Sequence, residues 1–354
     1  MPRWEDWLFA QKPCFFGELA RSPLWALSGI YWLAVKARLL GYKKGFFPSE
    51  KINLPVISVG NLSLGGSGKT PLVIWLAEKL SQRGLKPAVS IRGYRSQAEK
   101  SLVVLTPGSP SPSPILVGDE ARLIFQKLES VPVLVGRDRV EAGRKAGELG
   151  AELLILDDGF QHLRLKRDLD LVLIDSRRNI FKEKLFPRGR LREPLSELKR
   201  AGVLIFSRAE EEPGWRRELE RFHPQAKIFK MRYQVKNSGE LAGKRAFAFA
   251  GIAYPQDFFQ LAQRVKINLV GSWSFSDHHL YKEKEVRQIE KKAREKGAEI
   301  LLTTEKDAVR LEGFEFGLLL KTLEIQLDFF GEEEELLGFL LSCLNREGKD
   351  AQGN

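Results

Sequence analysis

Cysteine is scarce in this sequence, because Cys14 and Cys343 are the only two among 354 residues. Two cysteines near opposite ends of the chain exclude a disulfide framework and fit a reducing cytosol. Long hydrophobic runs are missing too: the apolar run from Leu24 to Val35 is shorter than the roughly 20 residues of a membrane-spanning helix. The start, MPRWEDWLFAQKP, lacks the basic residues and following apolar run of a secretory signal. We therefore expect neither a transmembrane span nor a signal peptide.

Positive charge is in excess, with 57 Lys and Arg against 46 Asp and Glu and a net charge of +11. This balance favours anionic partners: nucleotides, nucleic acid or an acidic membrane surface. The length suits two domains of roughly 150 residues each, with a sizeable buried core.

The first fifty residues combine aromatic and basic side chains. They hold four of the seven tryptophans, Trp4, Trp7, Trp25 and Trp32. Residues 21–47 contain no acidic residue, although they contain Arg21, Lys36, Arg38, Lys43 and Lys44. An apolar helix with a basic flank suits the interface of an anionic membrane. The alternative is a helix that packs on the protein's own core. We favour the membrane interface, because packing does not require a basic flank free of acids.

Strand and helix patterns alternate along the chain. Strands are predicted at 54–60, 86–94, 131–136, 152–159, 169–175 and 201–208, and helices at 70–84, 119–129 and 138–149. Such alternation indicates an α/β fold with a mostly parallel sheet flanked by helices. The pattern restarts after about residue 235, which indicates a second, smaller α/β domain. The predicted segments are a membrane-interface helix in 1–50, a nucleotide-binding core in 51–235, a smaller domain closing over the site in 236–325, and a C-terminal helix with a frayed tail in 326–354.

The stretch SLGGSGKT (63–70) lies between a predicted strand and a predicted helix, as a P-loop does. Ser63 stands where the usual pattern has its first glycine. The glycines let backbone N–H groups point at phosphate oxygens, Lys69 reaches the β- and γ-phosphates, and the Thr70 hydroxyl binds Mg²⁺. A glycine-rich turn with a chance Lys-Thr is the alternative, and the flanking strand and helix disfavour it. The predicted nucleotide-binding residues of this P-loop NTPase-type fold are Gly65, Gly66, Ser67, Gly68, Lys69 and Thr70.

An acidic pair ends one of the apolar strands, at LLILDDG. Two adjacent carboxylates repel each other, so burying Asp157 and Asp158 without a cation is costly. A P-loop also requires an acidic partner for its metal ion. We therefore predict a Mg²⁺ site formed by Thr70, Asp157 and Asp158, with a solvated turn as the alternative.

Seven motifs in one order resemble the tetraacyldisaccharide 4′-kinases of lipid A biosynthesis: SVGNLSLGGSGKTP, RGYRS, VGDEA, LDDGFQH, FPRGRLREP, SDHH and LLTTEKDAV. Ser63 is normal for that family. The resemblance implies transfer of the ATP γ-phosphate to the 4′-hydroxyl of a lipid-linked glucosamine disaccharide 1-phosphate. It also implies an enzyme bound peripherally to the cytoplasmic face of a Gram-negative inner membrane, without an obligate protein partner.

The resemblance further implies an acid–histidine pair. Asp119 in VGDEA matches the family's proposed base, which takes a proton from the attacking hydroxyl. His278 in SDHH matches its partner, although the adjacent His279 keeps that choice open. Which of Asp119 and His278 carries the proton stays open as well. By itself, Asp119 fits equally well the N-cap of the helix that it precedes.

Other side chains suit the two substrates. Gln161 and His162 follow the acidic pair; we assign Gln161 to the nucleotide and His162 to the acceptor, while a helix start on the rim of the site is the alternative. Tyr94 can stack on a sugar, or it can be a core aromatic. Arg192 can clamp a phosphate, because a guanidinium binds two oxygens at once. Arg137 is the second predicted cationic contact.

Two further features are less decisive. TTEKDA (303–308) either faces the nucleotide across a cleft or caps a helix through Thr304 and Asp307. His223, which precedes Pro224, is predicted to lie on the surface.

Two other classes of protein fit parts of the sequence. TTEKD faintly resembles a guanine-reading N-K-x-D motif of a GTPase or metallochaperone-like switch, but its asparagine is missing. The positive charge suggests an ATP-dependent nucleic-acid-binding protein, but basic and acidic residues are interleaved over much of the chain. The clearest basic segment free of acids is apolar and rich in tryptophan, which suits lipid better than nucleic acid.

Overall fold

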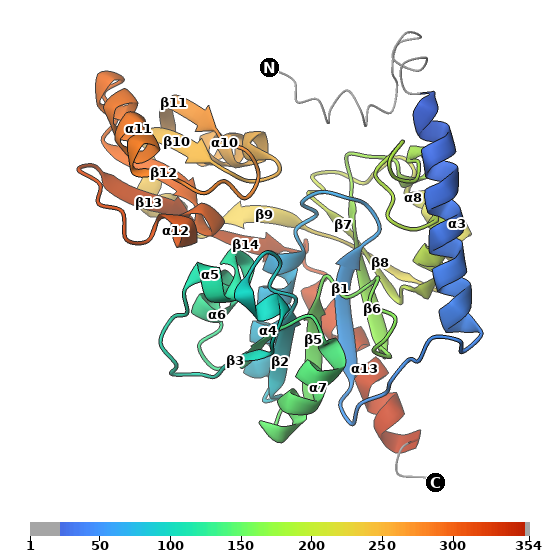
Figure 1. The fold of residues 1–354 in the computed structure, drawn as a ribbon. Coiled ribbons are helices and arrows are strands. Elements are labelled where there is room, and N and C mark those ends of the chain that lie inside the picture. Colours follow the sequence, from blue (N-terminus) through green and yellow to red (C-terminus); the bar gives the residue numbers. More distant parts are fainter. Residues whose placement is uncertain (1–21, 351–354) are drawn as a thin grey trace.

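A computed structural model gives the structure of the protein and describes residues 22–350. An eight-stranded sheet forms its centre, with the strand order β3-β4-β2-β5-β1-β6-β7-β8 (Figure 1). Neighbouring strands are parallel except β3, which runs antiparallel to β4. The strands are β1 (Val56–Asn61), β2 (Pro87–Ile91), β3 (Val103–Leu105), β4 (Val133–Val135), β5 (Leu153–Asp157), β6 (Leu169–Asp175), β7 (Val203–Ser207) and β8 (Lys227–Lys230).

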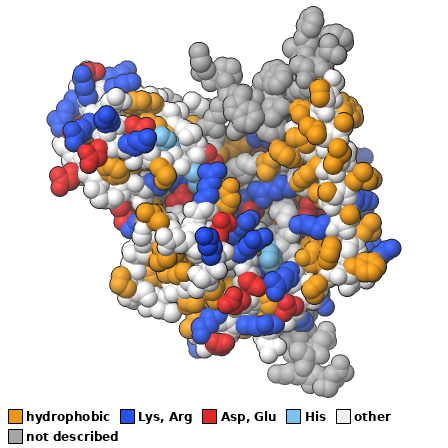
Figure 2. Space-filling model, viewed as in Figure 1, with side chains coloured by type: hydrophobic (Ala, Val, Ile, Leu, Met, Phe, Trp, Pro, Cys, Tyr) orange, Lys and Arg blue, Asp and Glu red, His pale blue; other side chains and the backbone are white. Residues whose placement is uncertain are grey.

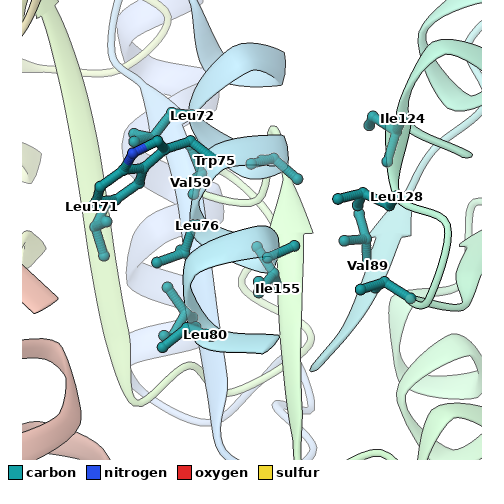
Figure 3. Packing of buried hydrophobic residues seen from close by; sticks show 14 of the residues in the cluster. Val59, Leu72, Trp75, Leu76, Leu80, Val89, Ile124, Leu128, Ile155 and Leu171 are labelled. Carbon is teal, nitrogen blue, oxygen red and sulfur yellow. The ribbon is translucent and has the colours of Figure 1, made fainter. Parts of the chain in front are cut away.

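Helices cover both faces of this sheet, and its central strands β1 and β5 are therefore buried along their whole length. They are α4 (Lys69–Gln82), α5 (Pro114–Val117), α6 (Asp119–Lys127), α7 (Arg139–Glu148) and α8 (Arg216–Phe222), with short 3₁₀ helices at Gln97–Glu99, Ile180–Lys182 and Leu195–Arg200. Leu72, Leu76 and Leu80 recur at helical spacing along α4 and are fully buried. They pack toward Val59 and Ile155 of the central strands (Figure 3). This core fixes the start of α4, and therefore the loop before it.

A second sheet has four parallel strands in the order β11-β10-β12-β13. Its strands are β10 (Arg245–Ala250), β11 (Asn268–Ser274), β12 (Ile300–Thr304) and β13 (Leu319–Leu323), and its helices are α9 (Ser238–Leu241), α10 (Pro255–Arg264), α11 (Glu283–Glu295) and α12 (Glu305–Leu311). The antiparallel pair β9 (Arg232–Val235) and β14 (Ile325–Asp328) carries the chain to this sheet and back. The predicted α/β fold class, with a second smaller sheet, is confirmed. The predicted domain boundaries stay a prediction.

Helix α3 (Pro23–Lys43) runs along one side of the molecule (Figure 1). A half-buried stripe faces the protein, formed by Leu24, Ser28, Tyr31, Val35, Leu39 and Tyr42. Ser28 Oγ donates to the carbonyl of Leu185 at 3.1 Å, and Tyr31 Oη donates to that of Arg192 at 2.8 Å. Gly41 is buried against Phe47, and the other residues of α3 are exposed and mostly apolar. No helix in the described range 22–350 is long and apolar enough to cross a membrane. Trp4 and Trp7 lie outside the described residues.

The C-terminal helix α13 (Glu333–Asp350) returns to the first sheet. Leu336, Leu337 and Leu340 are fully buried in the same core as α4. The helix continues to Asp350, and residues 351–354 of the predicted tail lie outside the described residues. The surface position predicted for His223 is wrong: its side chain is buried, and its Nε2 lies 2.8 Å from the carbonyl oxygen of Ala201.

Candidate active site

A cavity of about 2050 Å³ opens between the two sheets and α3. It is lined by the P-loop, the end of β5, the ribbon β9–β14, and the loops that follow β10 and β11. In Figure 2, Lys and Arg side chains gather in the middle of the view, between the apolar surface of α3 and the second sheet. Ligands in open parallel sheets bind beyond the carboxyl ends of the strands, and this cavity has that position.

The loop between β1 and α4 has P-loop geometry. Gly65 and Gly68 have φ values of 109° and 89°, which side chains other than glycine rarely adopt. A Cβ on Gly68 would also lie 1.8 Å from Tyr233 Oη. Ser63 forms an antiparallel bridge with Leu191, and this extended conformation needs no glycine. All six predicted nucleotide-binding residues of the loop line the cavity.

Lys69 and Thr70 face the acidic pair at the end of β5. Lys69 Nζ lies 3.2 Å from Asn61 Oδ1 and 3.5 Å from Asp158 Oδ1. The Thr70 hydroxyl donates to Asp157 Oδ2 at 3.4 Å. The P-loop therefore presents an ammonium group to Asp158 and a hydroxyl to Asp157.

The two carboxylates of the pair differ electrostatically. Burial, and next the negative charge of Glu120, raise the pKa of Asp157 to about 7. Burial also opposes the charge on Asp158, but Lys69 and Arg192 outweigh it and lower the pKa of Asp158 to about 2. Asp157 Oδ1 is buried and has no hydrogen-bond partner among the described residues. Asp157 therefore has one oxygen available for a cation.

The structure brings Asp119 and His278 together. His278 Nδ1 lies 3.2 Å from Asp119 Oδ2, so residues 159 positions apart form one pair. Asp119 is the first residue of α6 and its side chain does not cap that helix, whose N-cap is Gly118. His279 turns away: its ring stacks on Phe275 and its Nε2 lies 3.0 Å from a Glu285 oxygen. His278 lines the cavity, as do Glu120 and Asp277.

The other predicted contacts also line the cavity. Tyr94 is 55% exposed, which excludes the alternative of a core aromatic. Arg192 Nη1 donates to Asp158 Oδ2 at 3.0 Å. Gln161 Nε2 donates to the carbonyl of Asn61 at 3.0 Å, beside the P-loop. Arg137 is exposed at the end of β4.

Burial makes the side chain of His162 weakly basic. Burial, and next the charge of Arg139, lower the pKa of His162 to about 4. It is therefore neutral near pH 7. Its Nε2 is buried without a hydrogen-bond partner in the described part of the chain, and the residue lines the cavity. A neutral ring nitrogen in that position suits a hydrogen bond to a ligand.

Sequence reasoning missed several residues of this site. Lys306 Nζ bonds Glu120 at 2.8 Å and lies 3.3 Å from His278 Nε2. Arg139 is buried and donates to the backbone oxygen of Asp157 at 3.1 Å. Arg208 Nη2 donates to the carbonyl of Gly66 at 2.6 Å. Each forms contacts between segments far apart in the chain, so no local pattern could identify them.

A mostly parallel sheet with this loop before its first helix defines a P-loop nucleotide-binding protein. Comparison with known proteins agrees. The chain belongs to the family described as tetraacyldisaccharide-1-P 4′-kinase, whose model matches residues 20–345. The family resemblance seen in the sequence motifs is confirmed.

Relatives match the chain over most of its length. A tetraacyldisaccharide 4′-kinase of Desulfotalea psychrophila is 37% identical over 82% of this chain and 88% of its own length. A tetraacyldisaccharide 4′-kinase of Geobacter metallireducens is 39% identical over 83% of this chain and 89% of its own length. The fold is similar to a crystal structure of LpxK from Aquifex aeolicus in complex with ATP, with a TM-score of 0.74 and 31% identity. That match covers 92% of this chain and 99% of the other.

Proposed function

We propose that this kinase transfers the γ-phosphate of ATP to the 4′-hydroxyl of a tetraacyldisaccharide 1-phosphate, a lipid A precursor, giving lipid IVA. The observation that carries the proposal is that the P-loop and His278, whose ring bonds Asp119, line one cavity. The family membership supports the choice of acceptor.

Each predicted residue has a role in this reaction. The P-loop amides and Lys69 hold the phosphates of ATP, and Gln161 lies beside them. Arg192 and Arg137 contact phosphate groups of the donor or acceptor, because a guanidinium binds two oxygens at once. Tyr94 and His162 contact the acceptor sugar. An alcohol is a poor nucleophile, so the pair Asp119–His278 accepts the proton of the 4′-hydroxyl as the phosphoryl group is transferred.

The acidic pair suits Mg²⁺. No three His, Cys, Asp or Glu side chains of residues 22–350 form a metal cluster. Mg²⁺ needs fewer protein ligands, because it keeps water and binds one or two carboxylates together with substrate phosphates. Thr70, Asp157 and Asp158 supply hard oxygen ligands of this kind, and Asp157 Oδ1 is buried without a partner among the described residues. Bound there, the ion would neutralise charge on the phosphates.

Helix α3 supports a peripheral position on the cytoplasmic face of the bacterial inner membrane. Its exposed face is apolar, and Lys36, Lys43 and Lys44 can contact anionic lipid, whereas Arg38 pairs with Glu193 at 2.7 Å. Tyr31, Val35 and other residues of the same helix line the cavity, so α3 borders both the site and the proposed membrane surface. An acceptor could thus keep its acyl chains in the bilayer while its sugar enters the cavity. The reaction needs neither nucleic acid nor an obligate protein partner.

The alternatives find less support in the structure. A guanine-reading motif needs an accessible aspartate, but Asp307 of TTEKD is fully buried and binds the amide of Gly251 and the hydroxyl of Tyr281. Thr304 caps α12 as the other interpretation of that stretch predicts. The exposed face of α3 is apolar rather than densely basic, which favours lipid over nucleic acid.

The test is transfer of label from γ-labelled ATP to purified tetraacyldisaccharide 1-phosphate in detergent. Wild type should phosphorylate the lipid, and Asp119→Ala should lose about 10²–10⁴-fold in rate while it still binds ATP. Glu129→Ala, which removes an exposed carboxylate just after α6, is the matched control and should keep the rate. Absence of transfer by an ATP-binding wild type would overturn the proposed acceptor, and equal transfer by Asp119→Ala would overturn the proposed pair.

A further inference from the structure

Helix α12 of the second sheet packs against α6 of the first, and ion pairs line their contact. Arg122 of α6 bonds Glu312, and Lys127 bonds Glu305. At the end nearest the cavity, Lys306 bonds Glu120 at 2.8 Å. Each outer pair has one exposed partner, Glu312 or Lys127. The last pair in this row is different, because one partner is Asp119.

Arg310 of α12 uses all of its guanidinium nitrogens. Nε donates to Asp119 Oδ2 at 2.8 Å, and Nη2 bonds the same oxygen. Nη1 donates to the carbonyl of Gly251 and to Asp307 Oδ1, both at 3.0 Å. The Arg310 side chain is only 3% exposed and that of Asp119 16%. Arg310, which belongs to the second sheet, is therefore a buried hydrogen-bond donor to Asp119, the predicted proton acceptor.

A buried network fixes Arg310 in turn. Asp307 is fully buried and accepts hydrogen bonds from the Tyr281 hydroxyl at 3.0 Å and the Thr304 hydroxyl at 2.6 Å. It also accepts from the amide of Gly251 at 3.1 Å. Because these donors come from several segments of the second sheet, Asp307 has a single position, and the guanidinium bonded to it has one too. The second sheet thus presents a pre-positioned cation to Asp119.

We propose that Arg310 is a positioning residue for phosphoryl transfer, which fixes the carboxylate of Asp119 beside His278. The inference rests on the proposed function, because it takes Asp119 and His278 as the proton-accepting pair. It adds a residue from the TTEKDAVR stretch that touches neither the P-loop nor the acidic pair. Asp119 then has its working geometry only when α12 lies against α6.

The charges around Asp119 agree with this role. His278 and Asp277 face it from the loop after β11, Lys306 and Arg310 from α12, and Glu120 from its own helix. Burial opposes ionisation of Asp119, but the hydrogen bond from His278 and the charges of Lys306 and Arg310 outweigh it and hold its pKa well below the usual range. Without Arg310, the hydrogen bond from His278 and the charge of Lys306 would still lower that pKa, so the role of Arg310 is to fix the position of the carboxylate.

Lysine could supply the charge of Arg310 but not its geometry. An ammonium is a point charge on a flexible stem, whereas the planar guanidinium binds Asp119, Asp307 and the Gly251 carbonyl together. Arg310→Lys could bond Asp119 but not Asp307 and the Gly251 carbonyl at the same time, so it should position the carboxylate only partly. Arg310→Met should lose all of these bonds while preserving much of the side chain's length.

The experiment measures kcat and KM for lipid phosphorylation in wild type, Arg310→Met, Arg310→Lys and Asp119→Asn, because a misplaced reacting group lowers kcat without changing the binding of ATP. Arg122→Met is the matched control, since it removes a buried arginine from the same α6–α12 contact without touching Asp119. Thermal unfolding identifies any variant that does not fold. The KM for ATP should stay near that of wild type, because Arg310 does not contact the P-loop.

Arg310→Met should lose about 10²-fold near neutral pH, the usual effect of a misplaced reacting group. Arg310→Lys should show a smaller loss of kcat, and Arg122→Met should follow wild type. A kcat of Arg310→Met equal to that of Arg122→Met, or a KM for ATP that rises as kcat falls, would overturn the inference. If Arg310→Met does not fold, a wild-type kcat in Arg310→Lys would do so. Full activity of Asp119→Asn would instead overturn the proposed function on which the inference rests.

Discussion

The exposed face of α3 provides the most quantitative prediction. Ile30 is 65% exposed and Leu33 61%. Complete burial of such a side chain stabilises by about 1.5–3 kcal/mol, so covering the exposed part of each by lipid contributes about 1–2 kcal/mol. Replacing both by serine should therefore cost about 2–4 kcal/mol of membrane affinity. At about 1.4 kcal/mol per tenfold, this is a weakening of about 30- to 700-fold.

The assay is co-sedimentation of the full chain with vesicles of phosphatidylglycerol and phosphatidylethanolamine. Leu319→Ser is the matched control for Leu33→Ser, because Leu319 is 60% exposed but lies on β13. Only the α3 variants should lose binding, and the turnover of detergent-dispersed lipid should stay unchanged. If the double variant, with Ile30→Ser and Leu33→Ser, binds vesicles as strongly as wild type does, α3 is not the membrane contact.

Two predictions concern stability. Leu340→Ala should lower the free energy of unfolding by about 2–5 kcal/mol, because Leu340 is fully buried where α13 meets the core; urea denaturation measures this, and a loss below about 1 kcal/mol would contradict the packing of α13. His162 has a pKa of about 4 in the folded chain against an ordinary value of 6.5. The unfolded chain therefore binds more protons in that window, and stability should fall as the pH drops from about 6.5 to about 4, by about 2–3 kcal/mol from this group. Urea denaturation of wild type and His162→Gln at both ends of the window checks this: the variant should lose less stability, and an equal loss would show that His162 does not resist protonation.

The sequence predicted the fold well where the signal is local. The strands before and after the P-loop are short apolar runs, and α4, α6 and α7 have apolar residues at helical spacing, so their positions follow from periodicity. The strand β3 was missed because only one of its three residues is buried. The ribbon β9–β14 was missed as well. Its two strands are nearly ninety residues apart and pair only through tertiary structure.

The residues of the candidate site also divide into those that a local sequence pattern predicts and those that it does not. Lys69, Thr70, Asp157 and Asp158 could be predicted because a P-loop and an acidic strand end have recognisable local patterns. Asp119 required the family resemblance, since a helix start followed by Ala121 looks like an ordinary N-cap. Arg310 could not be predicted, because its partner lies 191 positions away and the contact exists only once the two sheets meet.

The measurement that tests the central claim most directly is the position of the phosphate in the product. Wild type is incubated with γ-labelled ATP, Mg²⁺ and tetraacyldisaccharide 1-phosphate, and the lipid product is analysed by phosphorus NMR and mass spectrometry. The account predicts one additional phosphate, carried on the 4′-oxygen and derived from the γ-position of ATP. Label that is released only as inorganic phosphate, or that enters another position of the lipid, would contradict it.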